Sequence, residues 1–157
     1  MRRHLHWREG HIATLIVVLI ILVLCMALQA IFVGVSLRWY GGLRALVVRN
    51  RHWRYVWILS AVLMLALVGN LLQMAMWALL FLMLGEFADY SSALYHSAVN
   101  FTTLGYGDVV MSPRFRLLGA LEAANGILMF GVSTAMMTAA VIDLLKHEAK
   151  VRGRDAE

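Results

Sequence analysis

The sequence predicts an all-α membrane protein with three transmembrane helices. The chain of 157 residues is 62% hydrophobic and only 15% charged, which excludes an ordinary soluble domain. Three long stretches, at residues 12–37, 55–85 and 117–142, carry no charge apart from Glu122. Because a hydrocarbon core of ~30 Å needs ~20 apolar residues in a helix, each stretch is long enough to span it.

The first element, residues 1–37, is expected to be an N-terminal tail followed by a permanent transmembrane helix. The alternative is a cleaved signal peptide, since basic residues precede the apolar run. The run is too long for one, and its Leu-Gln-Ala triplet lacks the small residue at both positions that cleavage prefers. Within the span we expect Cys25 to be a buried packing thiol. Around His4, His6 and His11 we expect a mobile tail rather than a metal site.

A basic cytoplasmic loop, residues 38–54, is expected between the first two spans. It contains no acidic residue, and the net charge of the whole chain is +5. Since this positive charge lies beside apolar spans, it indicates anionic lipid headgroups as partners and not nucleic acid. A voltage sensor is not expected, because its arginines would recur every three residues inside an apolar helix. The basic residues of the loop are Arg38, Arg44, Arg49, Arg51 and Arg54.

Between the second and third spans, residues 89–102 are expected to form a short helix with Asp89 or Ser91 as its N-cap. The residues that follow include Gly105 and Gly107, two positions apart. Carbonyl groups of an extended chain line up on one side only if the backbone alternates in handedness, which glycine permits without a Cβ penalty. The spacing therefore predicts that the carbonyls of residues 103–106 face one axis. Such backbone at membrane depth must lie inside protein or against water.

The stretch Thr-Thr-Leu-Gly-Tyr-Gly-Asp at residues 102–108 resembles the selectivity filter of potassium channels, and the resemblance extends over residues 93–141. It implies a homotetramer, in which four such segments surround K⁺. The pore domain that it implies is residues 55–145, with an outer helix at 55–85, a re-entrant pore helix at 89–102, a filter at 103–108 and an inner helix at 115–145. The ion-binding residues that it implies are Thr103, Leu104, Gly105 and Tyr106, with Gly107 at the outer mouth.

The resemblance also implies residues that support this filter and a cavity below it. Asp108 is expected behind the filter, near the outside. Tyr95 and His96 occupy the positions where family members often have two tryptophans that brace the filter, and Asn100 and Thr102 are further support residues. On the inner helix, Gly126 is expected either as a hinge or as a site of close helix packing. The side chains expected to face the cavity are Ile127, Phe130 and Thr134.

Glu122 is an ionisable residue within the third span. A charge there costs roughly 2.5 to 3.5 kcal/mol on insertion scales, so Glu122 is expected to be paired, protonated or in contact with water. Its candidate partners are Asn125, His96 and Asn100. We expect Glu122 and Asn125 to contact the pore helix behind the filter. Two interpretations stay open: a structural hydrogen bond, or a group that senses protons and controls gating.

The function that the sequence predicts is passive, potassium-selective conduction, with K⁺ as the permeant ion, no cofactor and no enzymatic activity. Two alternatives remain: a weakly selective cation channel, and a non-conducting membrane subunit that needs a partner protein. We expect a multi-pass protein of the cell (inner) membrane. Its N-terminus is expected outside, and residues 146–157 are expected to be a short cytoplasmic tail, since basic residues favour that side.

Overall fold

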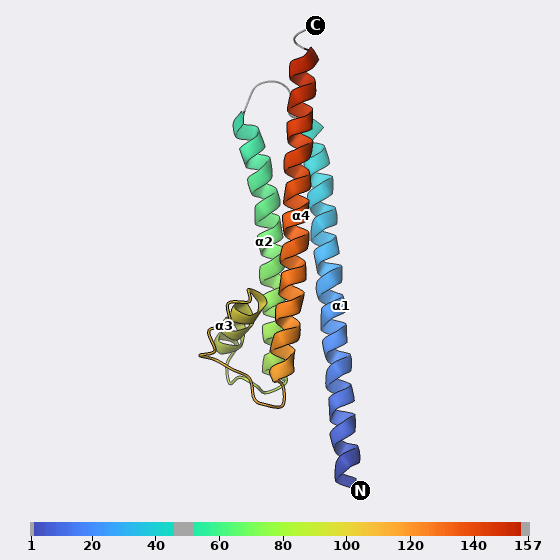
Figure 1. Cartoon of the computed structure of the whole chain (residues 1–157), viewed down its shortest axis with the longest axis vertical. Coiled ribbons are helices and arrows are strands. Elements are labelled where there is room, and N and C mark those ends of the chain that lie inside the picture. The colour runs from blue at the N-terminus through green and yellow to red at the C-terminus, as the bar shows by residue number, and fades with distance from the viewer. Residues whose placement is uncertain (1, 46–51, 155–157) are drawn as a thin grey trace. The chain divides into compact units, whose positions relative to one another are not determined.

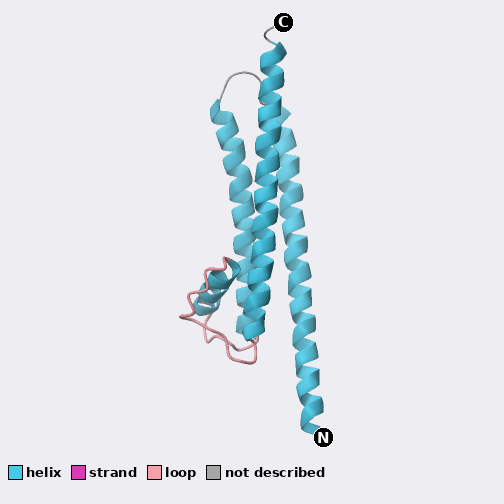
Figure 2. Ribbon diagram, viewed as in Figure 1, coloured by secondary structure: helices cyan, strands magenta, loops and turns pink. Residues whose placement is uncertain are grey.

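The computed structural model describes the backbone of residues 2–45 and 52–154, and the side chains of residues 15–41, 53 and 56–146. These residues form four helices in the order α1 (Arg2–Ala45), α2 (His52–Met83), α3 (Tyr90–Phe101) and α4 (Arg116–Arg154) (Figure 1). No strand occurs in the described part of the chain (Figure 2). The all-helical class that the sequence predicts is therefore confirmed.

Three of the helices contain segments that are long and apolar enough to cross a membrane. These segments are Leu15–Gly41 in α1, Val56–Met83 in α2 and Arg116–Lys146 in α4. They coincide with the three uncharged stretches of the sequence. The chain is accordingly a multi-pass membrane protein.

The helices are longer than the apolar stretches that predicted them. α1 begins at Arg2 and continues to Ala45, so part of the expected loop at 38–54 is helical. α4 continues to Arg154, through most of the segment 146–157 that was expected as a tail. The boundaries differ because apolar runs mark the bilayer core, whereas arginine, lysine, glutamate and leucine continue a helix beyond it at little cost.

Several residues considered in the sequence have side chains outside the described set. Arg49 and Arg51 lie outside the described backbone as well. The others are Arg2, Arg3, His4, His6, Arg8, His11, Arg44, Arg54, Lys150, Arg152 and Arg154.

The chain divides into two compact units. Unit 1 comprises Met1–Leu28 and Leu71–Ile127, and unit 2 comprises Gln29–Asn70 and Leu128–Glu157. Each of the helices α1, α2 and α4 is divided between the two units, whereas α3 belongs to unit 1 alone.

In unit 1, α2 ends in a glycine turn that starts the connection to α3. Gly85 has a φ of 73°, a left-handed conformation that favours glycine. Its N–H donates to the Leu82 carbonyl at 3.0 Å, and the Glu86 N–H donates to the Phe81 carbonyl at 3.1 Å, which is the Schellman pattern. The Glu86 carboxylate then accepts from the Ser112 N–H at 2.7 Å and from its hydroxyl at 2.8 Å. This pair of bonds joins the end of α2 to the segment before α4.

Unit 2 has an apolar core formed by α2 and α4. Val62, Ala66 and Met136 are buried there, with Val33 and Met137 packed against them. Polar contacts connect α1 to α4 in the same unit. The Gln29 amide donates to the Ser133 hydroxyl at 3.1 Å, and the Tyr40 hydroxyl donates to Asp143 Oδ2 at 2.7 Å.

Candidate functional site

The candidate site begins with α3, whose start is fixed by Asp89. Asp89 has an extended backbone conformation, and its side chain accepts from the Ser92 N–H at 2.9 Å and from the Ser92 hydroxyl at 2.8 Å. These bonds satisfy a donor that the first turn would otherwise leave unpaired. The Ser92 N–H lowers the pKa of Asp89 below its ordinary value. Of the two N-cap candidates in the sequence, the structure has Asp89. α3 lies beside α2 and α4 in unit 1 (Figure 1).

The segment that follows α3, residues 103–108, has a backbone that alternates in handedness. Thr103 has a φ of 60°, Gly105 of 60° and Gly107 of 75°, whereas Leu104 and Tyr106 have no positive φ. The sequence predicted this alternation at the two glycines. It did not predict the positive φ of Thr103. Among the non-glycine residues that the structure describes, only Thr103 has a positive φ. A left-handed conformation costs a residue with a side chain on the order of 1–2 kcal/mol, so the surrounding contacts must hold it there.

Those contacts come from the C-terminal turn of α3. The Thr103 N–H donates to the Asn100 carbonyl at 2.8 Å. The next two N–H groups, of Leu104 and Gly105, both donate to the Val99 carbonyl, at 2.9 and 3.3 Å. In an ordinary strand successive N–H groups point to opposite sides. Here three in a row point to one side, toward the end of α3, as the alternating φ values require.

Thr102 contributes to α3 and not to the 103–108 segment. Its N–H donates to the Ala98 carbonyl at 3.1 Å, and its hydroxyl donates to the same carbonyl at 2.7 Å. The residue was expected to support the segment directly. Its hydroxyl is instead used to close the last turn of the helix, which is a common role of threonine beside its own backbone.

A hydrogen bond from Tyr95 to Asp108 connects α3 to the end of the segment. The Tyr95 hydroxyl donates to Asp108 Oδ2 at 2.6 Å. This bond lowers the pKa of Asp108 below its ordinary value and raises the pKa of Tyr95 above its own. Tyr95 thus connects α3 to Asp108, at one of the two positions that were expected to support the filter.

His96 is held from several directions in the interior of unit 1. Its Nδ1 lies 2.8 Å from the Val109 carbonyl, and its Nε2 lies 2.8 Å from the Asn100 amide nitrogen. A carbonyl can only accept, so Nδ1 carries the proton and the amide donates to Nε2. The ring also lies 5.6 Å from that of Phe81 and 4.9 Å from that of Phe87. His96 therefore fixes the backbone just beyond Asp108, with Asn100 fixing the histidine.

Gly126 allows α4 to approach the end of α3. A Cβ at this position would lie 1.9 Å from the Phe101 carbonyl oxygen and 2.8 Å from its carbon. No side chain can replace the hydrogen without moving one of the helices. Of the two roles expected for Gly126, close packing is the one that this contact requires.

Glu122 reaches α3 from the same face of α4. Both Glu122 and Ser97 are fully buried, and the Ser97 hydroxyl is hydrogen-bonded to Glu122 Oε1. The hydroxyl also donates to the Met74 carbonyl at 2.8 Å. It has one proton for two acceptors, so both contacts form only when the carboxyl group is protonated and donates to the Ser97 oxygen. The expected contact with this helix is present. It is made with Ser97, which the sequence did not single out, and with Asn100, which was one of the three expected partners.

Asn125 lies next to Glu122 in this interior. It is 1% exposed, and neither its amide nitrogen nor its carbonyl oxygen has a hydrogen-bond partner among the described side chains and backbone. Trp77 and Cys25 are fully buried nearby, and the Cys25 thiol faces both Trp77 and Asn125. The expectation of a buried packing thiol at Cys25 is confirmed.

The exposed side of the site carries apolar and aromatic side chains. The side chain of Leu104 is 54% exposed although its N–H is bonded to α3, and the side chain of Tyr106 is 68% exposed. On α4, Ile127 is 61% exposed, Thr134 is exposed and Phe130 is half-buried. The Thr134 hydroxyl donates to the Phe130 carbonyl at 2.8 Å. Ile127 and Thr134, two of the three residues expected to face the cavity, are thus exposed within one chain.

Comparison with known proteins agrees with this geometry. A family model described as an ion channel matches residues 71–143. That segment contains the C-terminal part of α2, all of α3, the 103–108 segment and most of α4. No curated protein and no solved structure matched the chain. By this segment the chain is similar to a family of ion channels.

Proposed function

We propose that the protein is a homotetrameric, potassium-selective channel in which residues 103–108 of four chains form the filter. The observation that carries this proposal is the set of three successive N–H groups bonded to the end of α3. When N–H groups of alternating backbone point one way, the carbonyl groups point the other way. A carbonyl lies opposite the N–H of the next residue, so these bonds turn the carbonyls of residues 102–104 away from α3. We propose that the carbonyls of residues 103–106 continue this arrangement and face an axis where they replace the water shell of K⁺.

The exposed residues of the site support assembly around that axis. A single chain leaves Tyr106 68% exposed and Leu104 54% exposed, beside backbone that is otherwise held firmly. Backbone of this kind at membrane depth must be enclosed by protein or line a water-filled cavity. Neighbouring copies of the chain would cover these side chains, and the carbonyls would line the water-filled path.

The contact between Tyr95 and Asp108 supports selective conduction over the weakly selective alternative. That alternative depends on a filter that relaxes for lack of a brace. Here Tyr95 bonds Asp108 at 2.6 Å, and His96 bonds the Val109 carbonyl at 2.8 Å. These contacts attach the outer end of the filter to α3, and the bonds of residues 103–105 attach the inner end, which favours a fixed spacing of the ion ligands.

The orientation that we propose places the filter toward the outside and the C-terminus of the chain in the cytoplasm. α2 then begins and α4 ends on the inside, where positive residues and anionic lipids meet. Three spans place the N-terminus outside. The protein conducts passively in the cell membrane, with K⁺ as the permeant ion and no cofactor.

The test is ion flux through the purified chain in liposomes. We expect K⁺ flux that far exceeds Na⁺ flux and that is lost in Gly105→Ala. A Cβ at Gly105 meets no atom of its own chain within 4 Å, so the substitution acts through its φ of 60° and not through a clash within the chain. Gly34→Ala is the matched control, because Gly34 also has no neighbour within 4 Å and has no positive φ. Equal K⁺ and Na⁺ flux would contradict selectivity, and no flux from a folded tetramer would favour the partner-dependent subunit.

A further inference from the structure

Unit 2 has a groove between α2 and α4 to which the proposed conduction function assigns no role. The groove is open on one side and has a volume of about 280 Å³. Ala66 and Asn70 of α2 are buried at its floor. Exposed side chains of both helices form its rim, with Leu63 and Leu67 on α2 and Thr134 and Thr138 on α4.

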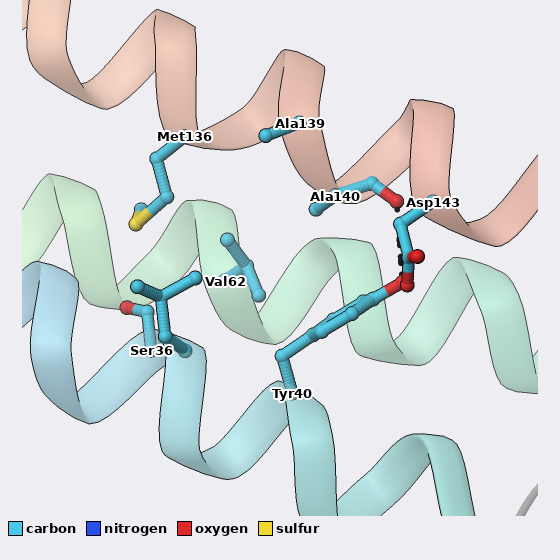
Figure 3. Close-up of a pocket in the computed structure, with 8 residues that line it drawn as sticks. Ser36, Tyr40, Val62, Met136, Ala139, Ala140 and Asp143 are labelled. Atoms are coloured by element: carbon cyan, nitrogen blue, oxygen red, sulfur yellow. Dashed lines mark hydrogen bonds between the residues drawn. The ribbon is translucent and has the colours of Figure 1, made fainter.

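The groove contains a polar side chain without a partner, unlike the hollow of unit 2 that Figure 3 shows. In Figure 3, the Tyr40 hydroxyl donates to Asp143 Oδ2 at 2.7 Å, so these two polar groups are bonded to each other within the chain. In the groove, Asn70 is 3% exposed, and its Oδ1 has no hydrogen-bond partner in the described part of the chain. A buried amide without partners is unfavourable in a membrane interior, so the groove favours an occupant that bonds to Asn70.

The α4 side of the groove determines which polar group fits there. The hydroxyls of Thr134 and Thr138 each donate to the carbonyl four residues earlier, at 2.8 and 2.9 Å. Because those protons are committed, the two threonine oxygens can only accept. The Asn70 amide can donate through its nitrogen and accept through its oxygen. A hydroxyl group both donates and accepts, so it matches the amide and the threonine oxygens together.

The depth of the groove restricts the source of that hydroxyl. Asn70 lies in the middle of the apolar segment Val56–Met83, ~20 Å from either end. Lipid headgroups and glycerol hydroxyls stay near the membrane surface, and acyl chains carry no donor. No charged residue of the described chain lines the groove, which disfavours an ion at this depth. The occupant must therefore be uncharged and dissolve in the bilayer.

A second copy of the chain and a water molecule fit the groove less well. Away from the ends of the described spans, exposed side chains are apolar except for Thr134 and Thr138, whose protons are already used. A neighbouring copy therefore brings no donor. Water could bond to Asn70, but the apolar rim at Leu63 and Leu67 would leave it against hydrocarbon.

We propose that the groove binds an uncharged lipophilic alcohol dissolved in the bilayer, with its hydroxyl group at Asn70. The hydrocarbon body lies along Leu63, Leu67 and Met137 and covers the open side. The size fits as well. A cavity of about 150 Å³ holds one benzene ring, so a groove of 280 Å³ accommodates an alcohol of about eight carbons.

The test uses the full chain in phosphatidylcholine nanodiscs with 3-azioctanol, an eight-carbon alcohol that crosslinks to protein when illuminated. Mass spectrometry locates the labelled residues. We expect saturable labelling of groove residues. At equal concentrations in the bilayer, 1-octanol should displace the label about fivefold more strongly than methyl heptyl ether, which has the same atoms but no donor. Equal displacement by the two competitors in the native chain would overturn the proposal, and this comparison needs no variant.

Three variants separate binding in the groove from partition into lipid. Asn70→Leu removes the amide at nearly the same volume and should lower labelling about fivefold. Leu67→Trp enlarges the rim and should lower labelling too. Leu71→Trp is the matched control, because Leu71 is exposed one turn further along α2 and does not line the groove. Equal labelling of the native chain, Asn70→Leu and Leu67→Trp would contradict the proposal. Because the readout is binding, it does not depend on whether the chain conducts.

Discussion

The two units of the chain are held together in different ways. Unit 1 has buried polar side chains at the contact between α3 and α4, together with a glycine where backbones meet. Unit 2 has a small apolar core and cavities of about 290 and 280 Å³. A polar contact requires a particular partner at a particular distance, whereas apolar side chains repack with little loss. Unit 1 should therefore tolerate few substitutions, and unit 2 should tolerate many.

The strongest test of this difference is a pair of glycine substitutions on α4. Gly126→Ala puts a methyl group 1.9 Å from the Phe101 carbonyl oxygen in unit 1. We expect a loss of about 3 kcal/mol or more, at the upper end of overpacking costs, and no flux. Gly131→Ala in unit 2 meets no atom within 4 Å and should gain about 0.5–1 kcal/mol from the helix. Thermal unfolding in detergent measures both, and similar midpoints for the two variants would refute the comparison.

The next largest effect is expected at the buried serine of unit 1. Ser97→Ala removes the partner of both Glu122 and the Met74 carbonyl, which should cost about 1–3 kcal/mol for groups left buried and unpaired. Thr138→Val in unit 2 removes an exposed hydroxyl that bonds only to its own helix, and should change stability by less than about 0.5 kcal/mol. Denaturant titration of the two variants gives both values. A Thr138 variant as unstable as the Ser97 variant would contradict the comparison.

Glu122→Gln separates the two roles left open for Glu122. Glutamine keeps a donor for the Ser97 oxygen and cannot titrate, so a structural hydrogen bond survives and a proton sensor does not. We expect folding, open probability and the pH response of flux to be unchanged, because Glu122 is fully enclosed. Single-channel recording over a pH series makes the measurement. A flattened pH response would establish Glu122 as a gating group.

An effect smaller than that of Ser97→Ala is expected where α1 and α4 meet in unit 2. Tyr40→Phe removes the bond to Asp143 and keeps the ring, which should cost about 0.5–1.5 kcal/mol. Flux and ion selectivity should not change. Stability and flux measured on one preparation provide the check, and a change of selectivity would show that unit 2 contributes to the filter.

The effect expected from Tyr95→Phe, at the exposed end of unit 1, is on ion selectivity. The pKa of Asp108 is lowered, so its bond is present above the ordinary carboxyl pKa of about 4 and is lost as pH falls through the lowered value. The pKa of Tyr95 is raised, so the bond is present below about pH 10 and is lost as pH rises through the raised value. Between these limits the variant should lose K⁺ over Na⁺ selectivity by the same factor at every pH. Reversal potentials at several pH values test this, and a difference that grows between pH 5 and 9 would point to another group.

Much of the fold could be predicted because bilayer thickness fixes how long an apolar run must be. The three runs became three helices, and Asp89 marked the start of α3. The ends of α1 and α4 could not be predicted in this way, since the charged residues beyond the bilayer core continue a helix as readily as they form a loop.

The candidate site could be predicted at positions where the residue type itself indicates a structural role. Gly105 and Gly107 indicated positive φ, and Tyr95, which was expected as a support of the filter, bonds to Asp108. Thr103 and Ser97 were not predictable in the same way. Thr103 adopts its φ of 60° because its neighbours bond to α3. Ser97 meets Glu122 because α3 and α4 pack against each other. A local sequence pattern indicates neither of these contacts.

The bonds that residues 103–105 make to α3 have a consequence for hydrogen exchange. Residues 102–108 are all exposed within one chain, and exposure alone would suggest that their amide hydrogens exchange quickly with deuterium. The amides of Thr103, Leu104 and Gly105 are instead bonded to carbonyls of the last helical turn. They can exchange only when that turn opens, so their exchange rates should follow those of α3. The amide hydrogens of residues 103–105 and of α3 should therefore exchange together, as one cooperative element.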